Sequence, residues 1–164
     1  MPVTPDEYAQ SVVNIQPDKP PRSILALDFG TRRIGVATGS SITGTASALT
    51  TLSSVTGEPN WSQLEALLKE WAPDLIALGL PFNSDGSDSE MTRVVHEFAD
   101  ELKTRFGIPV ELIDERYTSA EAEALLKEQR RRGIRTKKLK KEDVDAVAAQ
   151  LIAESWLNTK GKQG

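Results

Sequence analysis

The stretch that most constrains this 164-residue chain joins two short apolar runs through a glycine turn. Residues 24–27 are apolar without interruption, which is typical of a strand buried on both faces. Asp28 ends this run, Gly30 follows, and residues 34–38 form a second predicted strand. A carboxylate at the end of a buried strand is costly unless a metal, a cation or several donors stabilise it. Asp28 is therefore a candidate metal ligand; the alternative is that it only caps the turn through Asx hydrogen bonds.

The composition limits which metal such a site could hold. The sequence contains no cysteine and one histidine, so thiolate sites and multi-histidine zinc sites are excluded. A metal would be held mainly by carboxylates, which are ligands of hard cations. The candidate cofactor is therefore Mg²⁺ or Mn²⁺.

Length and composition also predict the bounds of the folded domain and the cellular compartment of the protein. We expect one domain over residues 24–159, between flexible tails at residues 1–23 and 160–164. The first tail holds five of the nine prolines and lacks the continuous apolar segment of a secretory signal. No apolar run has the length of a membrane span, and the absence of cysteine fits a reducing compartment. These features predict a cytoplasmic protein without a membrane partner.

The order of predicted elements indicates an α/β fold. The first three strands, separated by turns rich in Gly and Thr, predict an antiparallel meander: 24–27, 34–38 and 46–52. Two later strands, at 75–80 and 110–113, alternate with helices and should lie parallel to the first strand. Helices are expected from Trp61, from Ser87 or Asp88, from Ala120 and from Glu142. We therefore predict a mixed sheet of five strands, three antiparallel and then parallel, with helices on both faces.

Three acids should meet at one edge of this sheet. Sites in open α/β sheets form outside the carboxyl ends of the parallel strands, where Asp28 and Glu115 lie. The last helix, predicted over 142–157, adds Asp145, whose spacing places it on the face of Ala149 and Ile152. Asp143 should instead face water near the helix N-terminus.

The predicted inward set of this last helix is Val144, Val147, Ala148, Leu151 and Ile152. Three carboxylates at one edge would repel each other, and a divalent ion would remove that conflict. Metal-assisted phosphoryl transfer is a chemistry that uses such a cluster. The alternatives are that Glu115 pairs with Arg116 or a lysine, and that Asp145 only stabilises its helix N-terminus.

The charge of the chain is strongly segregated. The net charge is −4, which taken globally argues against a nucleic-acid partner. Residues 127–141, here called the basic block, nevertheless hold nine basic residues and one acid, a net charge of +8, so the rest of the chain carries −12. A solvated loop without a partner is one reading of the basic block, and phosphate binding is the other. Candidate contacts in it are Arg131, Arg132, Arg135, Lys137 and Lys138.

Four segments in this order resemble the YqgF/RuvX family, which is also called Holliday junction resolvase-like. They are residues 28–37, 79–87, 114–120 and 144–149, and the resemblance extends over about residues 24–157. It implies an RNase H-like fold and a metal-dependent nuclease. The catalytic and metal-binding acids implied by the motifs are Asp28, Glu115 and Asp145.

The resemblance further implies that the protein hydrolyses phosphodiester bonds and matures the 5′ end of precursor 16S rRNA in ribosome biogenesis. Arg32 and Arg116, each inside a matching segment, join the predicted nucleic-acid contacts. The alternatives are a resolvase that cleaves branched DNA, a non-catalytic RNA-binding assembly factor, and a nucleotide-binding kinase or ATPase. A kinase or ATPase of this kind would need two domains to enclose a nucleotide, and this chain has the length of one domain. Both a monomer and a homodimer agree with the sequence.

Overall fold

The computed structural model describes residues 21–55, 58–81, 83, 85–114, 124, 127–128, 131 and 141–161. These residues form a six-stranded sheet in the order β4-β3-β2-β1-β5-β6. The strands are β1 (Ser23–Phe29), β2 (Arg33–Ser40), β3 (Thr45–Val55), β4 (Glu58–Pro59), β5 (Leu75–Leu80) and β6 (Val110–Asp114).

The strand directions confirm the predicted mixed sheet. β1, β2, β3 and β4 pair in an antiparallel series, while β5 lies parallel to both β1 and β6. The sheet has one strand more than predicted, because the two residues of β4 pair with the end of β3. A two-residue strand that contains a proline gives no periodic signal, so the sequence did not indicate it.

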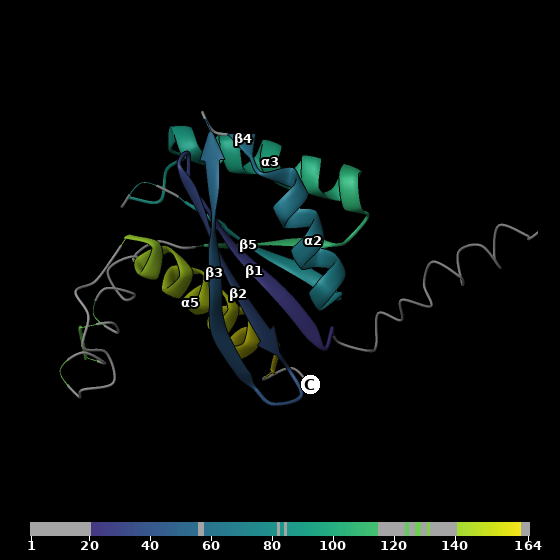
Figure 1. Ribbon diagram of the computed structural model, residues 1–164. Coiled ribbons are helices and arrows are strands. Elements are labelled where there is room, and N and C mark those ends of the chain that lie inside the picture. The colour runs from purple at the N-terminus through teal and green to yellow at the C-terminus, as the bar shows by residue number, and fades with distance from the viewer. Residues whose placement is uncertain are drawn as a thin grey trace, which may run out of the picture.

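Helices cover both faces of the sheet, as predicted (Figure 1). The helices are α2 (Trp61–Trp71), α3 (Glu90–Phe106) and α5 (Lys141–Gly161). Figure 1 shows α2 and α3 on one face and α5 on the other. The predicted helix 120–131 lies mostly outside the described residues.

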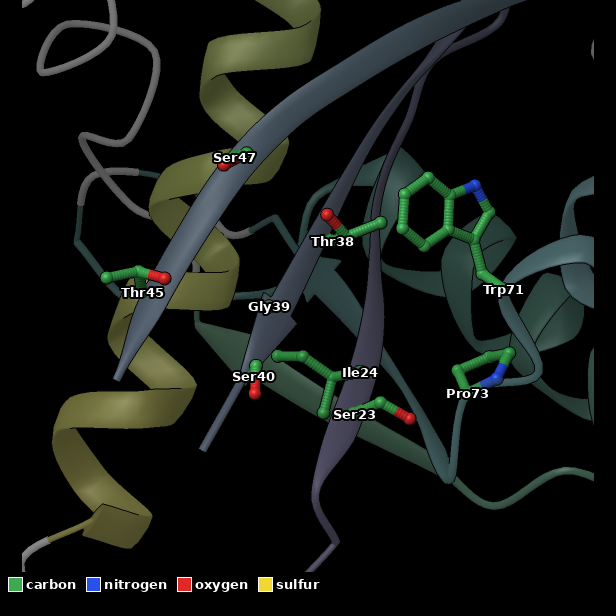
Figure 2. Close-up of a pocket in the computed structure, with 9 residues that line it drawn as sticks. All are labelled: Ser23, Ile24, Thr38, Gly39, Ser40, Thr45, Ser47, Trp71 and Pro73. Carbon is green, nitrogen blue, oxygen red and sulfur yellow. The ribbon is translucent and has the colours of Figure 1, made fainter. Parts of the chain in front are cut away.

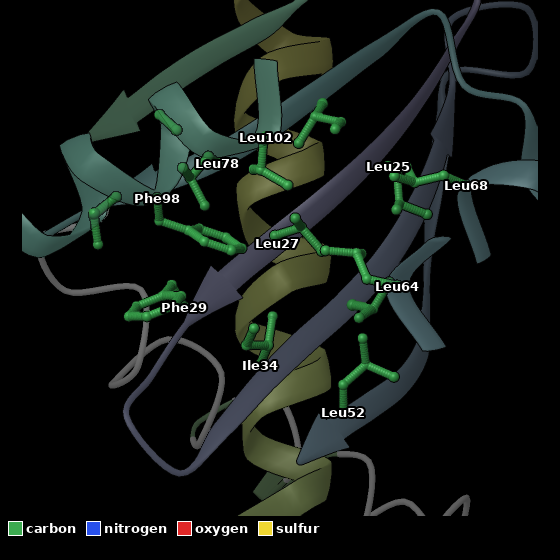
Figure 3. Close-up of a cluster of buried hydrophobic side chains, with 14 of the residues drawn as sticks. Leu25, Leu27, Phe29, Ile34, Leu52, Leu64, Leu68, Leu78, Phe98 and Leu102 are labelled. Carbon is green, nitrogen blue, oxygen red and sulfur yellow. The ribbon is translucent and has the colours of Figure 1, made fainter. Parts of the chain in front are cut away.

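Alternate residues of β1 supply the two layers of the core. Leu25, Leu27 and Phe29 point toward α2 and α3, where they pack in one buried cluster with residues such as Leu64 and Phe98 (Figure 3). Each of these five side chains is at most 6% exposed. The face made by these odd-numbered residues is thus closed by large apolar side chains.

The even-numbered residues of β1 face α5. Ile24 and Ala26 form a second buried cluster with Ala149, Ile152 and Trp156 of that helix. Small residues on both sides let the helix approach the sheet closely, which matters for the site below.

The predicted inward set of α5 is therefore divided between two clusters. Ile152 packs on the sheet, whereas Val147 and Ala148 are buried in a separate cluster with Val144 and Leu151. The helix is apolar on more than one side, so its hydrophobic period does not single out the face that meets the sheet.

The N-cap of helix α3 lies one or two residues after the predicted opening residue, Ser87 or Asp88. Ser89 is its N-cap, and the Ser89 and Thr92 side chains form a reciprocal capping box with each other's backbone N–H groups. Thr92 is buried, and its hydroxyl also donates a hydrogen bond to the carbonyl oxygen of Pro81, just after β5. This contact fixes the start of α3 at the carboxyl end of the sheet.

Candidate functional site

A tight turn connects the end of β1 to the start of β2. A Cβ atom at Gly30 would lie 2.7 Å from the carbonyl oxygen of Arg33, too close for any side chain without a backbone shift. The turn therefore requires glycine, and it brings Asp28 and Arg33 to the same end of the two strands. Asp28 is half-buried there.

Asp28 lies on the face of the sheet that α5 covers. It follows Ile24 and Ala26 at the period-two spacing of a strand, and both of these pack against α5. Asp28 pairs directly with Gly35 of β2 in an unbroken antiparallel register. Residues opposite each other in such a pair project from the same face, with Cβ atoms about 4.5–5.5 Å apart.

At Gly35 the backbone of α5 comes very close to the sheet. A Cβ atom at Gly35 would lie 1.9 Å from the carbonyl oxygen of Asp145 and 3.1 Å from the backbone nitrogen of Ala146. The absence of a side chain at this position thus admits the first turns of α5. As a result, Asp28 and Asp145 are neighbours on one face of the sheet, although they are 117 positions apart in the sequence.

The Asp145 carboxylate is paired with Arg33. The guanidinium Nε of Arg33 donates to Oδ2 of Asp145 at 2.6 Å, and the two side chains are 29% and 26% exposed. The sequence prediction placed Asp145 on the packed side of its helix, and this contact agrees with that orientation. It assigned no role to Arg33, however, and named the neighbouring Arg32 instead.

The strand period places Arg33 on the same face of β2 as Gly35 and Ala37. Arg33, Gly35 and Ala37 alternate along β2, and Gly35 and Ala37 both face α5. Arg32 lies in the turn and is exposed, and its carbonyl oxygen accepts a hydrogen bond from the Ser54 backbone nitrogen. Only the knowledge that α5 covers this face would have distinguished the two arginines.

Most of the other predicted site residues lie outside the part of the chain that the structure describes. Glu115, Arg116, Arg132, Arg135, Lys137 and Lys138 lie outside the described residues. Arg131 is described and exposed, and its guanidinium makes two hydrogen bonds to the Glu128 carboxylate, at 2.6 and 3.0 Å. This carboxylate raises the pKa of Arg131, so the predicted phosphate contact has an acidic partner within the same segment.

The chemistry of two of the three predicted acids suits a hard divalent cation. Asp28 and Asp145 supply carboxylate oxygens from a strand end and a helix start on one face. Within the described part of the chain, no group of three or more Asp, Glu, His or Cys side chains is close enough to hold a metal. The third predicted acid, Glu115, follows β6 in the sequence and lies outside that part.

A polar loop follows β5, the strand next to β1 in the sheet. Oδ1 of Asp85 accepts hydrogen bonds from the backbone nitrogen of Ser87 at 2.9 Å and from its hydroxyl at 2.6 Å. These bonds lower the pKa of Asp85. The Asn83 amide donates to the Ser87 hydroxyl and to the carbonyl oxygen of Asp88. The described part of this loop is thus held by its own hydrogen bonds beside the end of β1.

The hollow in Figure 2 lies at the opposite end of β1 from Asp28. It has a volume of about 220 Å³, and Ser and Thr residues such as Ser23, Thr38 and Ser40 line it together with the apolar residues Ile24 and Trp71. Its described lining contains no acidic or basic residue. This hollow therefore cannot supply carboxylate ligands, and the candidate site is the Asp28 edge.

Comparison with known proteins identifies the family and the fold of this chain. A family model described as "RuvX: Holliday junction resolvase" matches residues 22–159. The chain belongs to the RuvX family. A curated relative from Photorhabdus laumondii, named "Putative pre-16S rRNA nuclease", is 52% identical over 82% of this chain and 94% of its own length. A relative of the same name from Saccharophagus degradans is 47% identical over 82% of this chain and 92% of its own length.

Solved structures show the fold of this RuvX member. Thermus thermophilus RuvC in complex with a Holliday junction substrate aligns with a TM-score of 0.55 at 14% identity, over 87% of this chain and 98% of its own. The yeast mitochondrial Holliday junction resolvase Ydc2 aligns with a TM-score of 0.53 at 12% identity, over 96% of this chain and 87% of its own. The RNase H-like fold expected from the sequence is confirmed. No helix within the described residues is long and apolar enough to cross a membrane.

Proposed function

We propose that this RuvX member is a metal-dependent nuclease in which Asp28, Glu115 and Asp145 hold Mg²⁺ or Mn²⁺. The observation that carries the proposal is the close approach at Gly35, which brings the start of α5 beside Asp28. This approach supports a site in which two carboxylates from distant parts of the chain meet at one edge of the sheet. An arrangement of this kind costs electrostatic energy unless cations compensate it, and a catalytic metal site uses that arrangement.

Each residue would have a distinct task in the reaction. Asp28 and Asp145 would hold the cation, with Glu115 completing the set. When bound, the cation lowers the pKa of a water molecule and stabilises the charge that develops on the phosphate. Before metal binds, the Arg33 guanidinium donates to the Asp145 carboxylate at 2.6 Å. The glycine turn holds Asp28 and Arg33 at the same end of the two strands.

The substrate proposed first is precursor 16S rRNA, cleaved during maturation of its 5′ end. The support is the name shared by curated relatives that are about half identical to this chain over nearly their whole length. The RNA would be bound through its phosphates by Arg32, Arg116 and the basic block, since phosphate contacts are made largely by Arg and Lys. Ribosome biogenesis places this activity in the cytoplasm, and we propose that the protein acts there as a monomer or homodimer.

Branched DNA is the second candidate substrate, favoured by the family description as a Holliday junction resolvase. The two candidates share the metal chemistry and differ only in the nucleic acid that is cut. An RNA-binding assembly factor without catalysis would keep the fold and lose the reaction.

The experiment is incubation of the purified protein with Mg²⁺ or Mn²⁺ and labelled precursor rRNA, single-stranded RNA, duplex DNA and four-way junctions. We expect cleavage of precursor rRNA that stops when the metal is chelated. The Asp28→Asn variant, which keeps the shape and removes the charge, should lose activity by orders of magnitude while its circular dichroism spectrum is unchanged. Cleavage of junctions alone would favour the resolvase, and binding without cleavage of any substrate would favour the assembly factor.

A further inference from the structure

The Asp145 carboxylate already has a cation of the protein beside it. Arg33 Nε and Asp145 Oδ2 are 2.6 Å apart, which is short even for a charge-assisted hydrogen bond. About a quarter of each side chain remains in contact with solvent. Arg33 and a divalent cation would therefore compete for the negative charge of one proposed ligand.

This competition is electrostatic and local. A divalent ion on Asp145 would lie a few ångströms from the guanidinium of Arg33, and like charges at this distance repel even where water screens them in part. Metal binding thus requires Arg33 to release Asp145 or to share it at a cost. The Arg33 side chain is 29% exposed at the first residue of β2, so it can turn away without unfolding the strand.

A nucleic-acid phosphate offers the released guanidinium an equivalent partner. The planar guanidinium matches a phosphate as well as a carboxylate, through paired N–H donors. A phosphodiester that is to be cut must reach the metal, and so it must come close to the start of β2, where Arg33 lies. Arg33 could then exchange one anionic partner for the other within the reach of its own side chain.

We propose that Arg33 couples the binding of metal to the binding of nucleic acid. In the free protein Arg33 neutralises Asp145 and weakens metal binding; in the complex it contacts a substrate phosphate and leaves Asp145 to the cation. This inference rests on the proposed function, because it takes Asp145 to be a metal ligand. Arg33 is on this account a positioning residue, and by linkage each ligand strengthens the binding of the other by the same factor.

The quantitative expectation concerns Arg33→Gln, which removes the competing charge. In the absence of nucleic acid, this variant should bind Mn²⁺ about tenfold more tightly than the wild type. This factor corresponds to the lower end of the net strength of a hydrogen bond to a charged group, as suits a partly exposed pair. In the presence of saturating nucleic acid, the Mn²⁺ affinity of the two proteins should be the same. The coupling factor should therefore fall about tenfold.

The test is calorimetric titration of Mn²⁺ into the full chain, alone and with a four-way junction carrying phosphorothioate linkages, whose integrity is checked by gel afterwards. For the titration without nucleic acid, Arg32→Gln is the matched control, since it removes the same charge one position away from the residue that contacts Asp145. It should leave the Mn²⁺ affinity of the free protein unchanged. Arg33→Lys keeps a cation and should stay within about threefold of the wild type, which separates the effect of charge from that of side-chain shape.

The outcomes distinguish this inference from the proposed function. If the wild type binds Mn²⁺ and Arg33→Gln binds it equally or less tightly in the free protein, the coupling role is wrong and the metal site stands. If Arg32→Gln changes the affinity as much as Arg33→Gln, the effect is one of general charge, and the inference is again wrong. If the wild type binds no divalent cation with or without nucleic acid, the proposed metal-dependent function fails, and the inference fails with it.

Discussion

Gly35→Ala should damage the candidate site by pushing α5 off the sheet. The added Cβ would lie 1.9 Å from the Asp145 carbonyl oxygen, whereas real Cβ contacts essentially never fall below 3.0 Å. The first turns of α5 must therefore move by about 1.1 Å or more relative to β2. A displacement of about 1 Å in a catalytic arrangement can cost on the order of 10²-fold in rate.

The same substitution should lower stability by a modest amount. Overpacking typically costs about 1–3 kcal/mol, and the smaller entropy of the unfolded Ala chain returns about 0.4–1 kcal/mol. A net loss of about 1–2 kcal/mol would lower Tm by about 2–8 °C for a domain of this size. The assays are thermal unfolding followed by circular dichroism and cleavage of the preferred substrate at saturating metal.

Gly39→Ala is the matched control on the same strand and under the same helix. A Cβ at Gly39 would meet side-chain atoms of Ile24 at 3.0 and 3.2 Å and the Cβ of Ala153 at 3.5 Å. The end of the Ile24 side chain can adjust, so this variant should keep most of its activity and stability. Wild-type activity and Tm in Gly35→Ala would refute the argument that the missing side chain admits α5 to the site.

Two further variants test the basic block and the start of α3. Replacing Arg131, Arg132, Lys137 and Lys138 by Gln should weaken binding to all nucleic-acid sequences alike. It should flatten the dependence of log K on log salt by about 0.7 per lost phosphate contact on single strands, or about 0.9 on duplex DNA; an unchanged slope would identify the basic block as a solvated loop. Thr92→Val should lower the free energy of unfolding by about 1–3 kcal/mol in chemical denaturation, because it leaves the Pro81 carbonyl and the Ser89 N–H without the buried hydroxyl; a loss below about 0.5 kcal/mol would show that the capping box is not important.

The central strands could be predicted from sequence because burial on both faces leaves an unambiguous apolar run. Leu75–Leu80 was predicted with its observed bounds, and all six residues are buried. The outer strands are less well defined by their residues. β2 and β3 extend beyond the predicted 34–38 and 46–52, because their ends are rich in Ser and Thr, and backbone pairing rather than side-chain burial sets where they stop.

The sequence predicted which acidic residues belong to the candidate site, but it did not predict which residues are in contact. Local periodicity predicted the helical phase of Asp145 and placed Asp28 directly after a buried strand, although β1 continues through Asp28 to Phe29. The role of Gly35 and the pairing of Arg33 with Asp145 depend on which face α5 covers and on how closely it approaches. Neither property is local to the sequence around these residues. The assignment of Glu115 stays a prediction.

The central claim is that Asp28 and Asp145 hold a divalent cation, and calorimetric titration of Mn²⁺ tests it most directly. Asp28→Asn and Asp145→Asn should each weaken Mn²⁺ binding by more than tenfold while the fold is kept, because each removes a charged ligand. Asp143→Asn is the matched control, since two positions along a helix turn the side chain by about 200°. It should bind Mn²⁺ like the wild type. Wild-type affinity in Asp28→Asn and Asp145→Asn, or loss of binding in Asp143→Asn alone, would contradict the account.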